Sequence, residues 1–366
     1  MKRAEPIARL DTLRALAVTV VVVFHVAPEA LPWGFIGVDM FFSLSGFLML
    51  YLFLHEAEAD DFMGRLEKAK SFVARRFWRI YPPLIITLFF TLVCGLILFS
   101  SSHLYDAANS AVRAMVFIPN WFFYSQAGYF DTDSVFKPLL HTWSLGVEEQ
   151  FYIVFAVCIA LFSKRVFVIV VALTAVLSLG AWSYLTAANA VGGFSSALLP
   201  TVPDEPLSAL FFLPQYRAFQ FTIGALAAYA YVRGMRLGAW SQYAGFAGLA
   251  LAAWLGSDAE IAHISAPMVT IAMVLLMMRS DLCDRSAKIG IVQSTARVSY
   301  QLYLTHWPII VFWQYITFEP LGVFGMVMCL ALSVVTALAL YRFTDPMRKA
   351  WTGSTSSQHG SLARQS

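Results

Sequence analysis

The sequence predicts an all-α polytopic membrane protein with about ten transmembrane helices and both termini in the cytoplasm. Hydrophobic residues make up 59% of the 366 positions and charged residues only 13%, whereas a soluble domain usually carries about a quarter charged residues. Apolar runs of roughly 16 to 24 residues recur along the chain, and that length suits a bilayer crossing. A chain with so few charges could not cover a surface that faces water.

Ten apolar runs are the predicted spans, and the first and the eighth are short. They cover approximately residues 13–31, 35–55, 82–101, 139–162, 166–186, 208–232, 238–256, 264–279, 298–318 and 321–342. A further apolar segment at 109–126 is a candidate re-entrant element. The charged segment 56–74 is expected to be a cytoplasmic helix or loop. We expect one transmembrane domain at 1–345, followed by a short disordered cytoplasmic tail at 346–366.

The basic residues support this topology. With ten crossings, all but three of the 25 Lys and Arg residues fall in segments on one side, the exceptions being Arg113, Lys137 and Arg217. Such a bias marks the cytoplasmic side. The four cysteines are widely spaced and three lie in apolar runs, so the sequence predicts neither a disulfide framework nor a metal site.

Arg14 and His25 lie at the two ends of the apolar run "RALAVTVVVVFH". Eleven residues make almost three whole helical turns, so both side chains project from one helix face, about 16 Å apart along the axis. An ionisable residue inside a membrane span is functional by default. The alternative is an arginine that reaches the interface and a histidine that is hydrogen-bonded to a neighbouring helix.

The second group of polar residues is "HTWSLGVEEQFY", at the outer end of the fourth span. His141, Ser144, Glu148 and Tyr152 share one helix face, and Glu149 lies about 100° further round. A carboxylate that faces the bundle interior could orient a histidine and stabilise its imidazolium form. The alternative is a pair of solvated interfacial carboxylates.

Asp39 enters the second span from the same side as Glu148. It is a candidate partner of His25, or else a charge that the dipole of its helix favours.

Three arginines precede the third span in "FVARRFWRIYPP". Arg75, Arg76 and Arg79 fall within about one helical turn, and guanidinium groups grip phosphates bidentately. The alternative is a basic anchor on anionic lipid. With arginines inside and His25 in the outer half of the membrane, a phosphate-bearing donor needs a long arm, such as pantetheine. That arrangement favours acyl transfer through the membrane, although a proton-coupled carrier also uses buried His and carboxylates.

These motifs resemble acyltransferase family 3, the multi-span membrane O-acyltransferases of bacteria, over residues 9 to about 345. Arg14 and His25 match the family's Arg-X10-His motif, and Arg76 to Pro82 match its Arg-X-X-Arg-Ile-X-Pro element. The remaining matching signatures are "GVDMFFSLSGFLM", "HTWSLGVEEQFY" and "RVSYQLYLTHWPI". Five motifs in order are far more specific than any one of them.

The resemblance implies transfer of an acyl group, usually acetyl, from cytoplasmic acyl-CoA to hydroxyls of cell-surface sugars. It makes His25 the catalytic base or acyl carrier and Glu148 the essential carboxylate. It makes Arg14, Arg75, Arg76 and Arg79 the CoA ligands. Tyr300, Tyr303 and His306 fall in the last signature, where His306 either lines the cavity or is structural. Relatives with the "HTWSL" signature often carry an SGNH-hydrolase domain, and we expect a member without one. Asp345 stands where the family commonly has Glu.

We therefore expect a multi-pass enzyme of the bacterial inner membrane, with acetyl-CoA as the most plausible donor and no metal. The expected acceptor is a glycan or glycolipid hydroxyl, for example on O-antigen (lipopolysaccharide), exopolysaccharide or peptidoglycan. His25, oriented by Glu148 or Asp39, would activate that hydroxyl directly or carry the acyl group. The competing hypothesis is a carrier or flippase for a glycolipid or acylated product. No motif indicates a nucleic-acid ligand or an oligomeric state.

Overall fold

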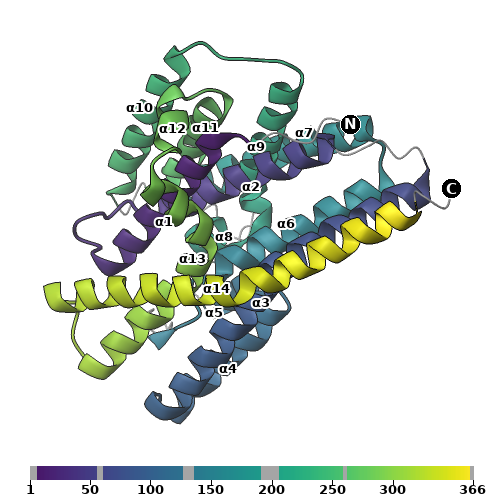
Figure 1. Cartoon of the computed structure of the whole chain (residues 1–366). Helices are drawn as coiled ribbons and strands as arrows, with labels where there is room; N and C mark the ends of the chain where they lie inside the picture. Colours follow the sequence, from purple (N-terminus) through teal and green to yellow (C-terminus); the bar gives the residue numbers. More distant parts are fainter. Residues whose placement is uncertain (1–5, 56–60, 127–135, 191–205, 259–261, 363–366) are drawn as a thin grey trace, which may run out of the picture.

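The computed structural model describes residues 6–55, 61–126, 136–190, 206–258 and 262–362, and these residues form helices and connections without a β-strand (Figure 1). The helices in chain order are α1 (Ala8–Val26), α2 (Ile36–His55), α3 (Phe62–Leu98), α4 (Ser101–Met115), α5 (Pro119–Gln126), α6 (Thr142–Leu161), α7 (Lys164–Ala190), α8 (Pro206–Phe212), η2 (Pro214–Tyr216), α9 (Ala218–Val232), α10 (Trp240–Gly256), η3 (Ala262–Ile264), α11 (Ser265–Met278), α12 (Asp281–Ser286), α13 (Gly290–Thr317) and α14 (Val323–Leu362).

Within the described residues, five helices are long and apolar enough to cross a membrane. They are Ile36–His55, Phe62–Leu98, Thr142–Leu161, Lys164–Asn189 and Val323–Ala350, and two shorter apolar helices are Ala218–Val232 and Ser265–Met278. Large apolar side chains such as Phe89 and Leu177 are well exposed on these helices. A helical chain with such surfaces is a multi-pass membrane protein. The number of ten spans and the side on which the termini lie stay predictions.

The third predicted span is only the second half of a longer helix. Helix α3 runs for 37 residues from Phe62 to Leu98, with Pro82 and Pro83 in its interior. The sequence prediction placed the start of the span at Pro82, where the apolar run begins. Proline lacks the N–H that a helix interior needs. The helix instead continues through both prolines, so Arg75, Arg76 and Arg79 are rigidly joined to the membrane segment. Residues 62–74 of the charged segment are also helical, and 56–60 lie outside the described residues.

Two other predicted elements are interrupted. The span at 208–232 consists of α8, the short turn η2 at Pro214 and then α9. The candidate re-entrant segment at 109–126 contains the end of α4 and the whole of α5, separated by a turn in which Phe117 has a φ of 58°. Both interruptions include a proline near the break, and proline cannot donate the backbone hydrogen bond that would continue a helix.

Helix α14 extends past the expected domain boundary at 345. It continues to Leu362, through most of the segment expected to be disordered. The carboxylate of Asp345 pairs with Arg348 and with Lys349, each at 2.6 Å. These i,i+3 and i,i+4 pairs are typical of a helix that continues beyond its membrane segment.

Helices that are distant in the sequence pack side by side around the centre of the protein. Helix α1 contacts α2 and α13, and α2 packs along α9 (Figure 1). The α2–α9 contact is close because each helix presents a glycine to the other: a Cβ at Gly46 would clash with the carbonyl of Phe221, and one at Gly224 with the carbonyl of Ser43. Small residues permit such close contact between membrane helices. The packing holds α1, α2, α3, α6 and α13 around one set of cavities.

Candidate functional site

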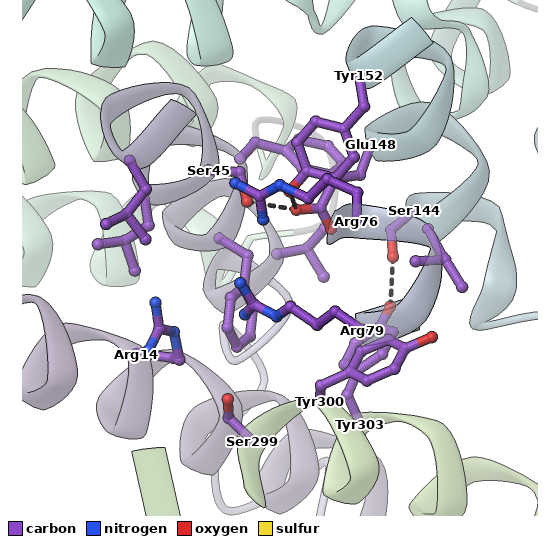
Figure 2. A pocket seen from close by; sticks show the side chains of 16 residues that line it. Arg14, Ser45, Arg76, Arg79, Ser144, Glu148, Tyr152, Ser299, Tyr300 and Tyr303 are labelled. Carbon is purple, nitrogen blue, oxygen red and sulfur yellow. Dashed lines mark hydrogen bonds between the residues drawn. The ribbon is translucent and has the colours of Figure 1, made fainter. Parts of the chain in front are cut away.

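The first cavity lies where α1, α2, α3, α6 and α13 meet, and we call it the arginine cavity. The space between its lining side chains is about 690 Å³, which includes the part open to solvent. Its polar lining residues are Arg14, Ser45, Arg76, Arg79, Ser144, Glu148, Tyr152, Ser299, Tyr300 and Tyr303. Figure 2 shows the guanidinium groups of Arg14, Arg76 and Arg79 directed into the same space. The cavity therefore gathers three positive charges from two helices.

The guanidinium groups of Arg76 and Arg79 have no carboxylate partner. Within the part of the chain that the structure describes, neither forms an ion pair, whereas Arg14 Nη1 lies 3.2 Å from Asp11 Oδ1. Arg76 instead lies over the ring of Tyr152, 4.6 Å from its centroid. The Glu148 carboxylate lines the same cavity and offsets part of their charge without forming an ion pair. The two half-buried guanidinium groups outnumber this carboxylate, which favours the binding of an anion, and guanidinium groups suit phosphate oxygens.

Arg75 lies outside this cavity, contrary to the expectation that one helical turn presents three arginines together. Its side chain is exposed, and its Nη1 donates to Ser71 Oγ at 2.6 Å. Consecutive residues on a helix point about 100° apart. Arg75 is only about 40° from Arg79 around α3, but it lies one turn nearer the start of the helix, and its guanidinium bonds back to Ser71 rather than entering the cavity.

Glu148 also belongs to the arginine cavity. Its carboxylate accepts hydrogen bonds from the hydroxyls of Ser45 and Tyr152 (Figure 2). The sequence-based hypothesis that Glu148 orients His25 is therefore wrong for this structure, since its polar partners come from α2 and its own helix. Glu149 points into the packed interior. Its side chain is buried, and within the described residues its Oε1 has no hydrogen-bond partner.

Ser144 and Tyr303 join α6 to α13. Their hydroxyl oxygens lie 2.6 Å apart, and the Tyr303 hydroxyl donates to the His141 carbonyl at 3.0 Å. Tyr300, one turn earlier on α13, donates to the Ile80 carbonyl of α3 at 2.9 Å. These tyrosines fix the walls of the cavity by hydrogen bonds between helices.

A second cavity contains His25, and we call it the histidine cavity. Its volume is about 1180 Å³. It is lined by Phe24, His25, Pro28, Phe35, Val38, Asp39, Leu140, His141, Trp143, Phe211, Arg217, Tyr303, Trp307, Ile310 and Gln314. Val38 and Tyr303 line both this cavity and the arginine cavity. Arg14 and His25 thus lie in two adjoining cavities, at opposite ends of the same helix.

The hydrogen-bond partner of His25 is His306. Nδ1 of His25 lies 3.0 Å from Nε2 of His306, and Nδ1 of His306 lies 3.1 Å from the Leu302 carbonyl oxygen. The ring of His25 also packs against Trp307, with 4.7 Å between the centroids. Sequence spacing shows which residues share a helix, but it does not show that α13 carries His306 to the face of α1.

Asp39 is part of a buried ion pair rather than a partner of His25. One of its oxygens accepts from Arg217 Nη1 at 2.6 Å and from Gln220 Nε2 at 2.8 Å. Asp39 is 3% and Arg217 8% exposed. The sequence analysis missed this role of Arg217, although it had singled out the residue as one of three basic positions on the outer side.

His141 lines the histidine cavity with both ring nitrogens unsatisfied. It is only 4% exposed, and within the described residues neither nitrogen has a hydrogen-bond partner. Buried polar groups are nearly always hydrogen-bonded, so His141 is a candidate contact for a molecule that enters this cavity. Its ring centroid lies 5.8 Å from that of His306.

A third cavity, which we call the Arg297 cavity, adjoins the arginine cavity. Its volume is about 760 Å³, and Arg14, Arg79, Ser299 and Tyr300 line both. The residues that it adds are Trp78, Ala296, Arg297, Gln301, Tyr341, Thr344, Asp345 and Arg348. The sequence analysis did not assign Arg297 or Arg348 to the site, although Arg297 opens the last motif. The Arg297 cavity, the arginine cavity and the histidine cavity therefore lie in series.

The described residues include no cluster of three or more His, Cys, Asp or Glu suited to a metal ion.

Comparison with known proteins agrees with the motifs. The profile of the acyltransferase domain family, acyltransferase family 3, matches residues 7–342. The peptidoglycan O-acetyltransferase OatA of Listeria monocytogenes is 33% identical over 158 residues, and the O-acetyltransferase OatA of Staphylococcus aureus is 34% identical over 157 residues. Each match covers 43% of this chain and 25% of the relative, so the similarity spans about a quarter of those proteins. No solved structure matches the chain.

Proposed function

This chain belongs to acyltransferase family 3, and from that premise we propose that it transfers an acyl group, most simply acetyl, from cytoplasmic acyl-CoA to a hydroxyl of a cell-surface or exported glycan or glycolipid. The observation that carries the proposal is the series of cavities. Arginines without carboxylate partners line one of them, and His25 lines the next. The enzyme would act in the bacterial inner membrane.

The arginine and Arg297 cavities suit the phosphate-bearing end of CoA. Arg76 and Arg79 would bind a polyphosphate, with Arg14 on the wall that the two cavities share and Arg297 in the Arg297 cavity adding positive charge. Arg348 also lines the Arg297 cavity, but it is already paired with Asp345. Trp78 and Tyr341 offer aromatic faces in the same region. Phosphates would bind these cations through charge-assisted hydrogen bonds.

The pantetheine arm of CoA would then pass Val38 and Tyr303 into the histidine cavity. Arg14 and His25 are separated by eleven residues of one helix, which is about 16 Å along the axis. An extended pantetheine arm is long enough to cover that separation. A donor bound at the arginines would then place its acyl group at His25.

The acceptor hydroxyl would enter the histidine cavity, whose lining includes the rings of Trp143, Phe211 and Trp307. Flat aromatic faces suit the apolar faces of sugar rings. His25 would take the hydroxyl proton while the oxygen attacks the thioester carbonyl. A carbon–oxygen bond forms, the carbon–sulfur bond breaks, and the proton on His25 passes to the leaving thiolate.

In a two-step version of this reaction, His25 itself attacks the thioester and carries the acyl group before the acceptor arrives. Loss of His25 abolishes transfer in both versions, whereas only the two-step version leaves an acyl-histidine that can be trapped without acceptor. The direct transfer is the simpler proposal, because the large histidine cavity can hold the thioester and a sugar hydroxyl together.

Radiolabelled acetyl-CoA tests the proposal with purified protein in nanodiscs. Wild type should bind acetyl-CoA and hydrolyse it slowly, His25→Ala should bind without turnover, and Arg76→Ala/Arg79→Ala should lose binding. Arg75→Ala is the matched control, since Arg75 is on the same helix but outside the cavity. If wild type binds no acyl-CoA at all, the transferase proposal fails and a carrier for a glycolipid becomes the function to pursue.

A further inference from the structure

We propose that His306 is a positioning residue that fixes the tautomer of His25, leaving Nε2 of His25 as the nitrogen that accepts the proton. This inference rests on the proposed function, in which His25 is the base. It is carried by a chain of two hydrogen bonds, from His25 Nδ1 to His306 Nε2 at 3.0 Å and from His306 Nδ1 to the Leu302 carbonyl at 3.1 Å.

The direction of this chain follows from the Leu302 carbonyl. A carbonyl oxygen can only accept, so Nδ1 of His306 must carry the hydrogen. A neutral imidazole has one N–H, and Nε2 of His306 is therefore an acceptor. The remaining partner, Nδ1 of His25, must donate to it. Nε2 of His25 is then left with its lone pair.

The opposite assignment is unfavourable. If Nε2 of His306 carried the hydrogen, its Nδ1 lone pair would face the Leu302 oxygen at 3.1 Å, with no proton between two acceptors. A doubly protonated His306 would place a positive charge on a side chain that is 0% exposed. Within the described residues, His306 forms no ion pair that would compensate this charge. Asp39, which lines the histidine cavity, already pairs with Arg217. Burying an unpaired charge is costly.

His306 is well placed to hold this geometry. It lies in the middle of α13, which packs along α1 and α14. The bond to Leu302 spans one turn of its own helix, so the orientation of the ring does not depend on a loop. Trp307 packs against the His25 ring, with 4.7 Å between the ring centroids. Helix α13 thus holds the His25 ring through two consecutive residues, His306 by a hydrogen bond and Trp307 by an aromatic contact.

The same bond assists the reaction after proton transfer. When Nε2 of His25 takes the hydroxyl proton, the ring becomes an imidazolium whose Nδ1–H still donates to His306. A hydrogen bond from a charged donor is stronger than a neutral one, so the bond strengthens as the reaction proceeds. The arrangement resembles the carboxylate partner of a catalytic histidine in its geometry, with a neutral acceptor in place of the charge.

Two substitutions of similar size separate this role from simple packing. His306→Gln keeps an oxygen that can accept from His25 Nδ1, and His306→Met removes the acceptor while filling the space. The assay measures acetyl-CoA binding and thioester turnover for wild type and both variants in nanodiscs. We expect unchanged binding in both, turnover about a hundred-fold lower in His306→Met, and turnover within about ten-fold of wild type in His306→Gln.

The inference is overturned if His306→Met turns over like wild type, or if both variants lose turnover equally. A wild type that does not turn over acetyl-CoA at all overturns the proposed function first, and the inference with it.

A second measurement needs no variant of His306 to fold. In ¹⁵N-histidine-labelled wild type, with the His25 signals assigned by their loss in His25→Gln, Nδ1 of His25 should be protonated and Nε2 should not. A His25 protonated at Nε2 would contradict the proposal.

Discussion

The ion pair between Asp39 and Arg217 offers a quantitative test of the fold around the histidine cavity. The two side chains are joined at 2.6 Å, and both are almost wholly buried. Arg217→Gln would leave the Asp39 carboxylate with Gln220 as a partner, but without the cation. Removing one member of a buried ion pair typically costs about 3–5 kcal/mol, because the remaining charge is desolvated and uncompensated.

The double variant Asp39→Asn/Arg217→Gln separates the charge effect from the loss of packing. It removes both charges and keeps amides that can hydrogen-bond, so it should recover most of the stability lost in Arg217→Gln. The assay is the free energy of unfolding of the four proteins of this cycle, measured by titration with SDS in mixed micelles. A non-additive cycle of about 2 kcal/mol or more supports the reasoning, since contacting residues couple by about 0.5–3 kcal/mol. Arg217→Gln as stable as wild type, or fully additive losses, would refute it.

Three further predictions concern packing and the path between the cavities. Gly46→Ala should lower the free energy of unfolding by about 1–3 kcal/mol through overpacking against α9. The control is Gly180→Ala, which should leave the free energy of unfolding unchanged because Gly180 has open space beside it. Equal effects of the two substitutions would contradict the close helix contact. Arg76→Ala/Arg79→Ala should weaken CoA binding by roughly 10²–10⁴-fold, from about 1.5–3 kcal/mol for each charge-assisted contact, and Arg75→Ala by less than a few-fold. Val38→Trp should block the passage between the arginine cavity and the histidine cavity, so that CoA still binds while thioester turnover is lost. Val38→Leu is the control. Unimpaired turnover in Val38→Trp would exclude this path.

The sequence predicted the class of fold and several neighbours within the candidate site because those features depend on local patterns. Apolar runs showed a polytopic helical membrane protein, and the spacing of Arg14 and His25 placed both on one helix. The polar face of "HTWSLGVEEQFY" correctly brought Glu148 and Tyr152 together, since residues four apart on a helix are neighbours. Both relations lie within a single helix, where periodicity is sufficient.

The sequence analysis failed where the answer depends on contacts between helices. The partners of His25 and Asp39 are His306 and Arg217, which lie 281 and 178 residues away in the chain. No periodicity within one helix could identify them. The path of α3 through Pro82 and Pro83 was missed for a related reason, because tertiary packing can stabilise a helix that the local sequence disfavours. Arg75 was assigned to the cluster because it lies one turn from Arg79, although its guanidinium bonds back to Ser71 outside the cavity.

The central claim is that one acyl-CoA occupies the cavities in series and brings its acyl carbon to His25. A structure of the protein with a non-hydrolysable acetyl-CoA analogue tests this most directly. We expect phosphates at Arg76 and Arg79 and the pantetheine arm between Val38 and Tyr303. The acetyl group should lie beside His25, close enough for an acceptor hydroxyl to contact both Nε2 of His25 and the acetyl carbonyl. An analogue bound elsewhere, or one whose arm ends in the arginine cavity without entering the histidine cavity, would contradict it.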